Sequence, residues 1–212
     1  MKDEEISLLS ELEITNWWNY GRQKILHSVL NNIHQDFSLK IFDVGCGPGG
    51  TTLSFLKFGD VFGTDFSIFA LKKAKEKGLQ NVFRSTLSDI PIKNQSFDVI
   101  MALDVIEHVE HDLIVLNELK RILTSNGYLI ITVPAFQFLW SEHDVALLHF
   151  RRYNKHTLSK VLDSSGFKII KISYFVSFLF PFVAIYRLFS KIKITSKKPK
   201  ANKGKFPKPI ND

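Results

Sequence analysis

The chain of 212 residues is long enough for one domain with a full hydrophobic core and marginal for two. Its net charge of +7 comes from residues 191–212, which hold eight lysines and one acid, so a basic globular surface for nucleic acid is not expected. The single cysteine, Cys46, excludes an intrachain disulfide and favours a reducing compartment, and the acidic and polar first 13 residues do not resemble a secretory signal.

Short apolar runs alternate with helical patterns from Leu39 onward, after an amphipathic helix predicted at residues 17–33. The runs are almost continuously apolar, as is typical of strands that are covered on both faces. They predict strands at residues 39–44, 61–65, 81–84, 97–103 and 128–133. Helices are predicted at residues 51–57, 68–77, 112–123 and 157–165, and a sixth strand at residues 167–174.

Capping residues support the helix boundaries. Ser67 is placed to cap the start of the helix at 68–77, and Gly78 lies just past its end. Asn126 and Gly127 are expected to close the helix at 112–123. Strands and helices that alternate in this way predict a Rossmann-like, doubly wound α/β fold with a mostly parallel sheet.

The first predicted strand runs into a glycine-rich loop, IFDVGCGPGG. Gly45, Gly47 and Gly50 satisfy the G-x-G-x-x-G pattern of dinucleotide-binding proteins, with Asp65 20 residues after the first glycine. Asp43 argues against a dinucleotide, because a carboxylate beside the loop would repel a pyrophosphate. S-adenosylmethionine (SAM) has no phosphate, and a carboxylate attracts its ammonium and sulfonium groups. The loop therefore favours SAM, and an NAD-dependent oxidoreductase is the alternative.

Two further acids lie where parallel strands are expected to present a ligand. Asp65 ends the second strand, where a carboxylate can accept hydrogen bonds from both hydroxyls of a ribose. Asp89, in the dipeptide Ser88-Asp89 before the fourth strand, is expected to accept a hydrogen bond from the adenine amino group. A turn residue without a ligand is the alternative for Asp89.

Four segments, taken in order, resemble the motifs of class I SAM-dependent methyltransferases of the small-molecule type, related to the methyltransferases of ubiquinone biosynthesis. DVGCGPG resembles the first motif, GTDFS the acid of the second strand, SDIPIKNQSFDVIMALDVIEHV the central block, and LKRILTSNGYLIITVP the helix and strand that follow. The resemblance runs from about residue 17 to residue 174 and implies a SAM-dependent methyltransferase. A non-catalytic SAM-binding protein is a further alternative.

The resemblance implies roles for individual residues. Asp43 and the glycine loop should contact the methionine part of SAM, Asp65 the ribose and Asp89 the adenine, while Leu103 should lie near the transferable methyl group. Near the N-terminus, Arg22 is a candidate to reach the SAM carboxylate. The predicted cofactor-binding residues are Arg22, Asp43, Gly45, Cys46, Gly47, Gly49, Asp65, Phe66, Ser88, Asp89 and Leu103.

The sheet of this family usually ends with a seventh, antiparallel strand. No segment after Tyr174 resembles that strand, so we expect it to be missing. The expected organisation is a helical cap at residues 1–35, a SAM-binding domain at 36–175 with an insertion at 135–155 on the substrate side, an apolar segment at 176–190 and a disordered basic tail at 191–212.

A general base is needed only when the methyl acceptor is a hydroxyl or a neutral amine. His108, His143 and His149 are the candidates, because an imidazole titrates near neutral pH. His108 belongs to a D-x-x-E-H segment that begins at Asp104 and resembles the E-x-x-E-H metal motif of the ubiquinone-pathway relatives. Because aspartate replaces the first glutamate and is shorter, we expect no metal. Capping of the next helix is the alternative role for Glu107 and His108.

The insertion contains the segments WSEHD and HFRRY. Arg151 and Arg152 are expected to clamp a carboxylate or phosphate of the acceptor, since a guanidinium binds either in a two-pronged way. A contribution to the SAM pocket, or a surface loop, is the alternative. The predicted substrate-binding residues are Asp104, Glu107, Arg151, Arg152 and Tyr153.

The apolar stretch at residues 172–189 is 18 residues long and contains Pro181 and Arg187, so a transmembrane span is not expected. An aromatic segment followed by lysines is typical of an interfacial anchor on an anionic membrane, and a core helix with a solvated tail is the alternative. The sequence therefore predicts a cytoplasmic protein. If the segment is an interfacial anchor, the protein is expected at the inner face of the cell membrane. Its acceptor would be a small molecule or a lipid-linked or glycan-linked compound.

Overall fold

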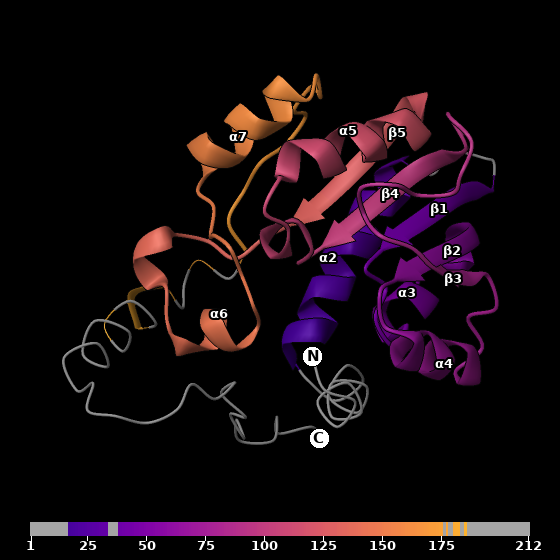
Figure 1. Ribbon diagram of the computed structural model, residues 1–212, viewed down its shortest axis with the longest axis horizontal. Coiled ribbons are helices and arrows are strands. Elements are labelled where there is room, and N and C mark those ends of the chain that lie inside the picture. The colour runs from indigo at the N-terminus through magenta and orange to yellow at the C-terminus, as the bar shows by residue number, and fades with distance from the viewer. Residues whose placement is uncertain (1–16, 34–37, 176, 178–179, 183–184, 186–212) are drawn as a thin grey trace. The chain divides into compact units, whose positions relative to one another are not determined.

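The computed structural model describes residues 17–33, 38–175, 177, 180–182 and 185 (Figure 1). The predicted basic tail and the first part of the predicted helical cap lie outside these residues. The described chain forms two compact units. Unit 1 holds the described residues up to Val105 together with Asn117–Thr132, and unit 2 holds Ile106–Leu116 and the described residues from Val133 onward.

Unit 1 is built on a five-stranded, all-parallel sheet with the strand order β3-β2-β1-β4-β5 (Figure 1). The strands are β1 (Leu39–Val44), β2 (Gly59–Asp65), β3 (Val82–Arg84), β4 (Phe97–Leu103) and β5 (Leu123–Thr132). The predicted fold class and the first five predicted strands are confirmed. The direction of winding reverses between β1 and β4, and a doubly wound sheet binds its ligand beyond the carboxyl ends of the strands at this point.

Both faces of the sheet bury apolar side chains, as the near-continuous apolar runs predict. On one face, Ile41 belongs to the same core as Leu30 of α2 (Trp17–Ile33). On the opposite face, the ring of Phe42 stacks on that of Phe97 with 4.7 Å between their centroids. Adjacent residues of β1 thus pack into the apolar layers on opposite faces of the sheet. This packing fixes the position of the strand that leads into the glycine loop.

The ladder between β4 and β5 contains a shift of register, because its successive pairs join Phe97 to Leu123 and Val99 to Tyr128. The extra residues of β5 between these pairs include Asn126 and Gly127, which the sequence placed at the end of the preceding helix. That helix, α5 (Asp112–Ile122), is confirmed but passes directly into β5.

The helices of unit 1 follow the predictions with one difference. Helix α4 (Ile68–Glu76) is confirmed, and the Ser67 hydroxyl accepts a hydrogen bond from the Ala70 amide, as expected of an N-cap. The helix predicted at 51–57 is shorter than expected: α3 (Gly50–Leu53) ends after four residues, and a 3₁₀ turn at Leu56–Phe58 follows it.

The prediction of a sixth strand at residues 167–174 is wrong. These residues belong to no β-ladder of the described chain, and the sheet ends at β5. Their alternation of apolar and polar residues is that of a strand, but a strand also needs a partner that completes its hydrogen bonds. Among the described residues no strand of either direction follows β5.

Unit 2 consists of short helices joined by turns. It contains the 3₁₀ turns η2 (Ile106–His108) and η3 (Gln137–Leu139), and the helices α6 (Glu142–Ala146) and α7 (Lys155–Ser164), the latter close to its prediction. A backbone hydrogen bond of 2.8 Å from the Phe150 amide to the Glu107 carbonyl joins the insertion to η2. None of the described helices of either unit combines the length and the hydrophobicity that a membrane crossing requires.

Candidate functional sites

The glycine loop follows the carboxyl end of β1 and turns the chain into α3. Gly45, Gly47 and Gly49 have φ angles of +71°, +54° and +80°. This region of backbone conformation is strained for residues with a side chain. A Cβ atom at Gly45 would lie 2.7 Å from Val105, whereas one at Gly47 would meet no atom within 4 Å. Gly45 is therefore needed for packing, and the backbone at Gly47 has an open side that a ligand can approach.

Asp43 holds the loop from within the protein. Its side chain is only 3% exposed, and its carboxylate accepts a 2.5 Å hydrogen bond from the hydroxyl of Thr52 in α3. The strand end and the helix after the loop are thereby joined. The structure thus gives Asp43 a role in shaping the loop, in addition to the contact with SAM that the sequence predicts.

Asp65, at the carboxyl end of β2, lies beside the same loop. One oxygen of its carboxylate accepts a 3.0 Å hydrogen bond from the Gly47 amide, and the other accepts a 2.8 Å bond from the Ser67 amide. Phe66 follows it with 68% of its surface exposed, and the Arg84 guanidinium lies 4.8 Å over its ring. An acid and an exposed aromatic ring therefore stand together beside the loop, as a nucleoside requires.

The other predicted cofactor residues lie at or near the same edge of the sheet in unit 1. Cys46 is buried in the glycine loop, and a Cβ at Gly63 of β2 would meet its sulfur at 2.9 Å, so the thiol fills space in the core. Leu103 is half-buried at the end of β4. Ser88 and Asp89 are exposed in the loop between β3 and β4.

Asp104 directly follows β4 and has a φ of +57°, an uncommon conformation for a residue other than glycine. Its carboxylate forms a 2.5 Å ion pair with Arg22 of α2 and accepts a 3.1 Å hydrogen bond from the Thr132 hydroxyl. Backbone strain of this kind occurs at binding sites, where the surrounding structure holds it in place. In this structure Arg22 pairs with Asp104, the residue that follows Leu103. The sequence predicts that Leu103 lies near the transferable methyl group.

Unit 2 brings together the residues of the two insertion motifs. Asp144 of α6 is fully buried and forms a two-pronged ion pair with Arg152, with distances of 2.6 and 3.1 Å. The same carboxylate lies 3.0 Å from Nδ1 of His149. Burial by itself would raise the pKa of Asp144, but the hydrogen bonds from His149 and Arg152 outweigh it and hold that pKa well below its usual range. Asp144 is therefore a fixed negative charge beside His149.

Arg151 makes a separate ion pair within unit 2. Its Nη1 lies 3.0 Å from Asp112, and the buried Tyr153 donates a 2.9 Å hydrogen bond from its hydroxyl to the same carboxylate. Burial, followed by this bond to Asp112, raises the pKa of Tyr153, so the phenol stays protonated. Both arginines of the predicted acceptor clamp thus bind acids of unit 2.

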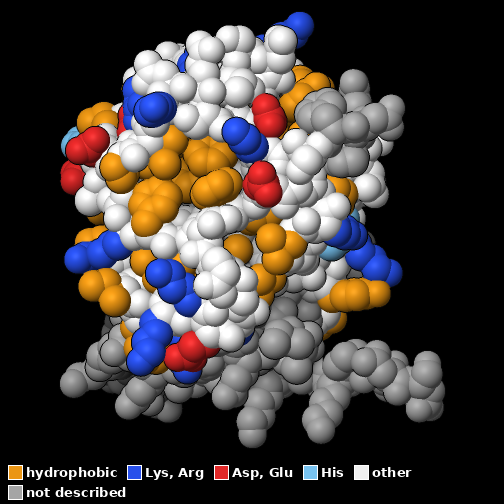
Figure 2. Space-filling model, turned by 90° about the vertical axis from the view of Figure 1, so that its right-hand side faces the viewer, with side chains coloured by type: hydrophobic (Ala, Val, Ile, Leu, Met, Phe, Trp, Pro, Cys, Tyr) orange, Lys and Arg blue, Asp and Glu red, His pale blue; other side chains and the backbone are white. Residues whose placement is uncertain are grey.

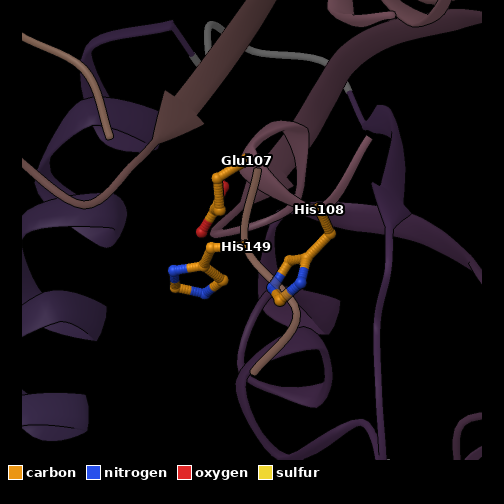
Figure 3. A group of neighbouring side chains, drawn as sticks. All are labelled: Glu107, His108 and His149. Carbon is orange, nitrogen blue, oxygen red and sulfur yellow. The ribbon is translucent and has the colours of Figure 1, made fainter. Parts of the chain in front are cut away.

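Glu107, His108 and His149 form a group in unit 2 whose oxygen and nitrogen atoms all lie within 4.8 Å of one another. The carboxylate of Glu107 and the ring of His108 are both directed toward His149 (Figure 3). Glu107 is fully buried, His108 is exposed, and the two imidazole rings meet edge to face with centroids 4.6 Å apart. These residue types fit a metal ion. The third histidine of the prediction, His143, lies in α6 and is outside this group.

Three structural partners were not among the residues predicted from the sequence. Thr52 holds Asp43, Asp144 joins His149 to Arg152, and Asp112 joins Arg151 to Tyr153. The sequence singles out the segment WSEHD without giving a role to its last residue, Asp144, which forms a capping box with Ser141 at the start of α6. Its contacts with residues further along the chain depend on the tertiary fold, so sequence spacing does not reveal them.

Comparison with known proteins places this geometry in context. Residues 42–131 match a family described as a methyltransferase domain. The chain is 31% identical over 130 residues to an uncharacterized protein of Methanocaldococcus jannaschii (61% of this chain, 55% of the relative). It is 30% identical over 148 residues to a ubiquinone biosynthesis O-methyltransferase of Actinobacillus pleuropneumoniae (60% and 63%). The matched part is thus less than two thirds of either relative.

Among solved structures, the chain resembles a SAM-dependent methyltransferase from Mesorhizobium loti with a TM-score of 0.61. The likeness covers 75% of this chain and 90% of the other at 18% sequence identity. At this identity it establishes the fold of the chain.

Proposed function

We propose that the chain transfers a methyl group from SAM to an acceptor, because residues 42–131 match a methyltransferase domain and the chain shares its fold with a SAM-dependent methyltransferase. The observation that carries the proposal is the arrangement at the carboxyl ends of β1 and β2. A glycine loop with one open backbone face lies there against Asp65 and the exposed ring of Phe66. The ring offers a surface for adenine and the acid offers two acceptors for ribose hydroxyls.

The residues of unit 1 suffice to explain why SAM is favoured over a dinucleotide. Asp43 places a carboxylate at the loop, and the loop itself, Gly45–Gly50, contains no basic side chain. A pyrophosphate at this position would meet negative charge, whereas the ammonium and sulfonium of SAM would meet an attractive field. The methyl group moves by in-line displacement, in which the acceptor bonds to carbon as the carbon–sulfur bond breaks. The protein mainly aligns the two partners and excludes water.

Calorimetric titration with S-adenosylhomocysteine, the product form of the cofactor, tests the proposal. We expect one site per chain, with a Kd on the order of micromolar, that is lost in Asp65→Ala. NAD serves as the control ligand and should not bind. Because Asp65 also accepts two backbone amides, thermal unfolding of the variant must show that it remains folded. Binding of NAD in place of S-adenosylhomocysteine would identify the alternative, an oxidoreductase.

For the acceptor, we propose a lipid-linked or glycan-linked compound met at the inner face of the cell membrane. Two features support this choice. The sequence concentrates eight lysines in residues 191–212, and the residues before them include Phe182 and Ile185, which are 71% and 54% exposed. On the face shown in Figure 2, lysines and arginines lie among acidic and hydrophobic side chains. Failure to bind anionic vesicles at low salt would contradict this part of the proposal.

A further inference from the structure

We propose that Glu107, His108 and His149 of unit 2 bind one divalent transition-metal ion. Each contributes one atom that can coordinate a metal, and these atoms lie within 4.8 Å of one another (Figure 3). An ion bound at about 2.1 Å to each ligand needs them roughly 3 to 4 Å apart. His108 is exposed, so its side chain can rotate and bring a ring nitrogen closer to the ligand atoms of Glu107 and His149.

The backbone brings these residues together independently of any metal. The Phe150 amide donates to the Glu107 carbonyl at 2.8 Å, which fixes the residue after His149 against the turn that carries Glu107 and His108. The His149 amide in turn donates to the Asp144 carbonyl at 2.9 Å. The group is therefore held by main-chain bonds on both sides of His149, as expected of a preformed site.

The hydrogen bond to Asp144 orients the His149 ring for coordination. Because Asp144 is held ionised by Arg152, the ring nitrogen that faces it, Nδ1, carries a proton and donates it. In the neutral form of the ring, the lone pair is then on the other nitrogen, Nε2. A carboxylate behind the second ring nitrogen is the arrangement found around most metal-binding histidines, where it fixes the tautomer and raises the basicity of the ligand. The Arg152–Asp144–His149 chain thus serves the site as a support.

The donor set selects the class of ion. Two imidazoles and one carboxylate suit Zn²⁺, Fe²⁺ or Mn²⁺, whereas Mg²⁺ and Ca²⁺ prefer sites made of oxygen ligands. Positive charge beside the fully buried Glu107 also offsets the cost of keeping a carboxylate away from water. Such an ion would lower the pKa of a hydroxyl that coordinated to it.

The proposed ligands differ from those that the D-x-x-E-H spacing indicates. Asp104 is not in the group, because Arg22 and Thr132 of unit 1 hold its carboxylate. The insertion supplies His149 as the third ligand. The reason for expecting no metal from the sequence was the short side chain of Asp104, and that reason does not apply to Glu107, His108 and His149.

Direct metal titration tests the proposal without any methyl acceptor. Untagged protein, dialysed against a chelator, is titrated with Zn²⁺ by calorimetry and with Co²⁺ by visible absorption. The wild-type chain should bind one equivalent, and Glu107→Gln and His149→Gln should abolish this site. Asp144→Asn keeps the ligands but removes the charge behind His149, so we expect affinity to fall by about 10- to 100-fold. His156→Gln, an exposed histidine of α7 in the same unit, is the matched control and should bind as the wild type.

The result that would overturn the proposal is Zn²⁺ binding that is absent in the wild type or unchanged in the ligand variants. Because Glu107 is buried, its replacement could disturb folding, and thermal unfolding must accompany the titration. His108→Gln provides a second variant without this difficulty, since His108 is exposed. If folded His108→Gln and His149→Gln both bind Zn²⁺ like the wild type, the site is refuted. The titration contains no SAM, so its outcome is independent of the proposed methyl transfer.

Discussion

At the scale of single residues, two glycines of one loop serve different purposes. Gly45 and Gly47 share a left-handed backbone, yet only at Gly45 would a Cβ atom collide with the protein. Gly45→Ala should destabilise the fold by about 2 to 5 kcal/mol, from backbone strain and overpacking against Val105 together. Gly47→Ala should cost only about 1 to 2 kcal/mol from strain but should abolish binding of S-adenosylhomocysteine. Urea unfolding and calorimetry separate the two effects, and tight binding by Gly47→Ala would show that the open side of the loop is not the cofactor site.

Two adjacent threonines of α3 offer a second comparison. The Thr52 hydroxyl donates to buried Asp43, whereas the buried Thr51 hydroxyl has no hydrogen-bond partner among the described residues. Thr52→Val should therefore cost about 1 to 3 kcal/mol, since a buried carboxylate loses a donor. Thr51→Val should change stability by less than about 1 kcal/mol or increase it, because a methyl replaces an unused hydroxyl. Urea unfolding of both variants checks the difference, and equal losses would contradict this account of Asp43.

At the scale of helices and strands, much of unit 1 could be predicted from the sequence. The bounds of α2, β1 and β4 coincide with their predictions, because each depends on a local pattern of apolar residues. The prediction of a sixth strand was wrong because the alternation of apolar residues is a local pattern, whereas a strand also needs a partner strand from elsewhere in the chain. The site divides in the same way: the glycine loop and Asp65 follow from a motif, whereas the contact of Asp144 with His149 depends on how unit 2 folds.

Helix α5 also anchors a loop, through a group of charges that depends on pH. Arg121 donates to the carbonyls of Ile90 and Ile92 and to Glu118, which itself accepts from the Ile90 amide. The hydrogen bond from Arg121 holds the pKa of Glu118 below its ordinary value of 4.5. A depressed folded pKa stabilises the fold above the unfolded value, and that contribution is lost as the pH falls through the folded value.

We therefore expect Glu118→Gln to destabilise the protein by about 0.5 to 1 kcal/mol at pH 7, after allowance for solvent screening. The difference from the wild type should shrink as the pH falls below 4.5. Urea unfolding at a series of pH values measures it. The matched control is Glu76→Gln, whose carboxylate also pairs with a basic residue, Lys73, but on the exposed surface of α4. It should leave stability unchanged, and a pH-independent effect of Glu118→Gln would disprove the role of its charge.

At the scale of the whole molecule, charge is distributed unevenly along the chain. Residues 191–212 supply the net charge, so the proposed membrane contact should depend on them. Replacing Lys191, Lys193, Lys197 and Lys198 by glutamine should weaken binding to anionic vesicles by at least about tenfold at low salt. Replacing Lys72, Lys73, Lys75 and Lys77, in and just after α4, changes the net charge equally and serves as the control. Co-sedimentation with vesicles measures binding. An equal loss of binding in both variants would mean that the attraction to the vesicles does not depend on residues 191–212 in particular.

The strand order has a consequence for synthesis of the chain on the ribosome. The central strand β1 pairs with β4 through Ile41 and Val99, and the residues between them must be made before this pairing can form. At about 5 to 20 residues per second, the backbone N–H and C=O groups on one edge of β1 stay unpaired for on the order of 3 to 12 seconds. Translation speed over this stretch, rather than the stability of the finished protein, then sets how long the nascent chain is open to aggregation.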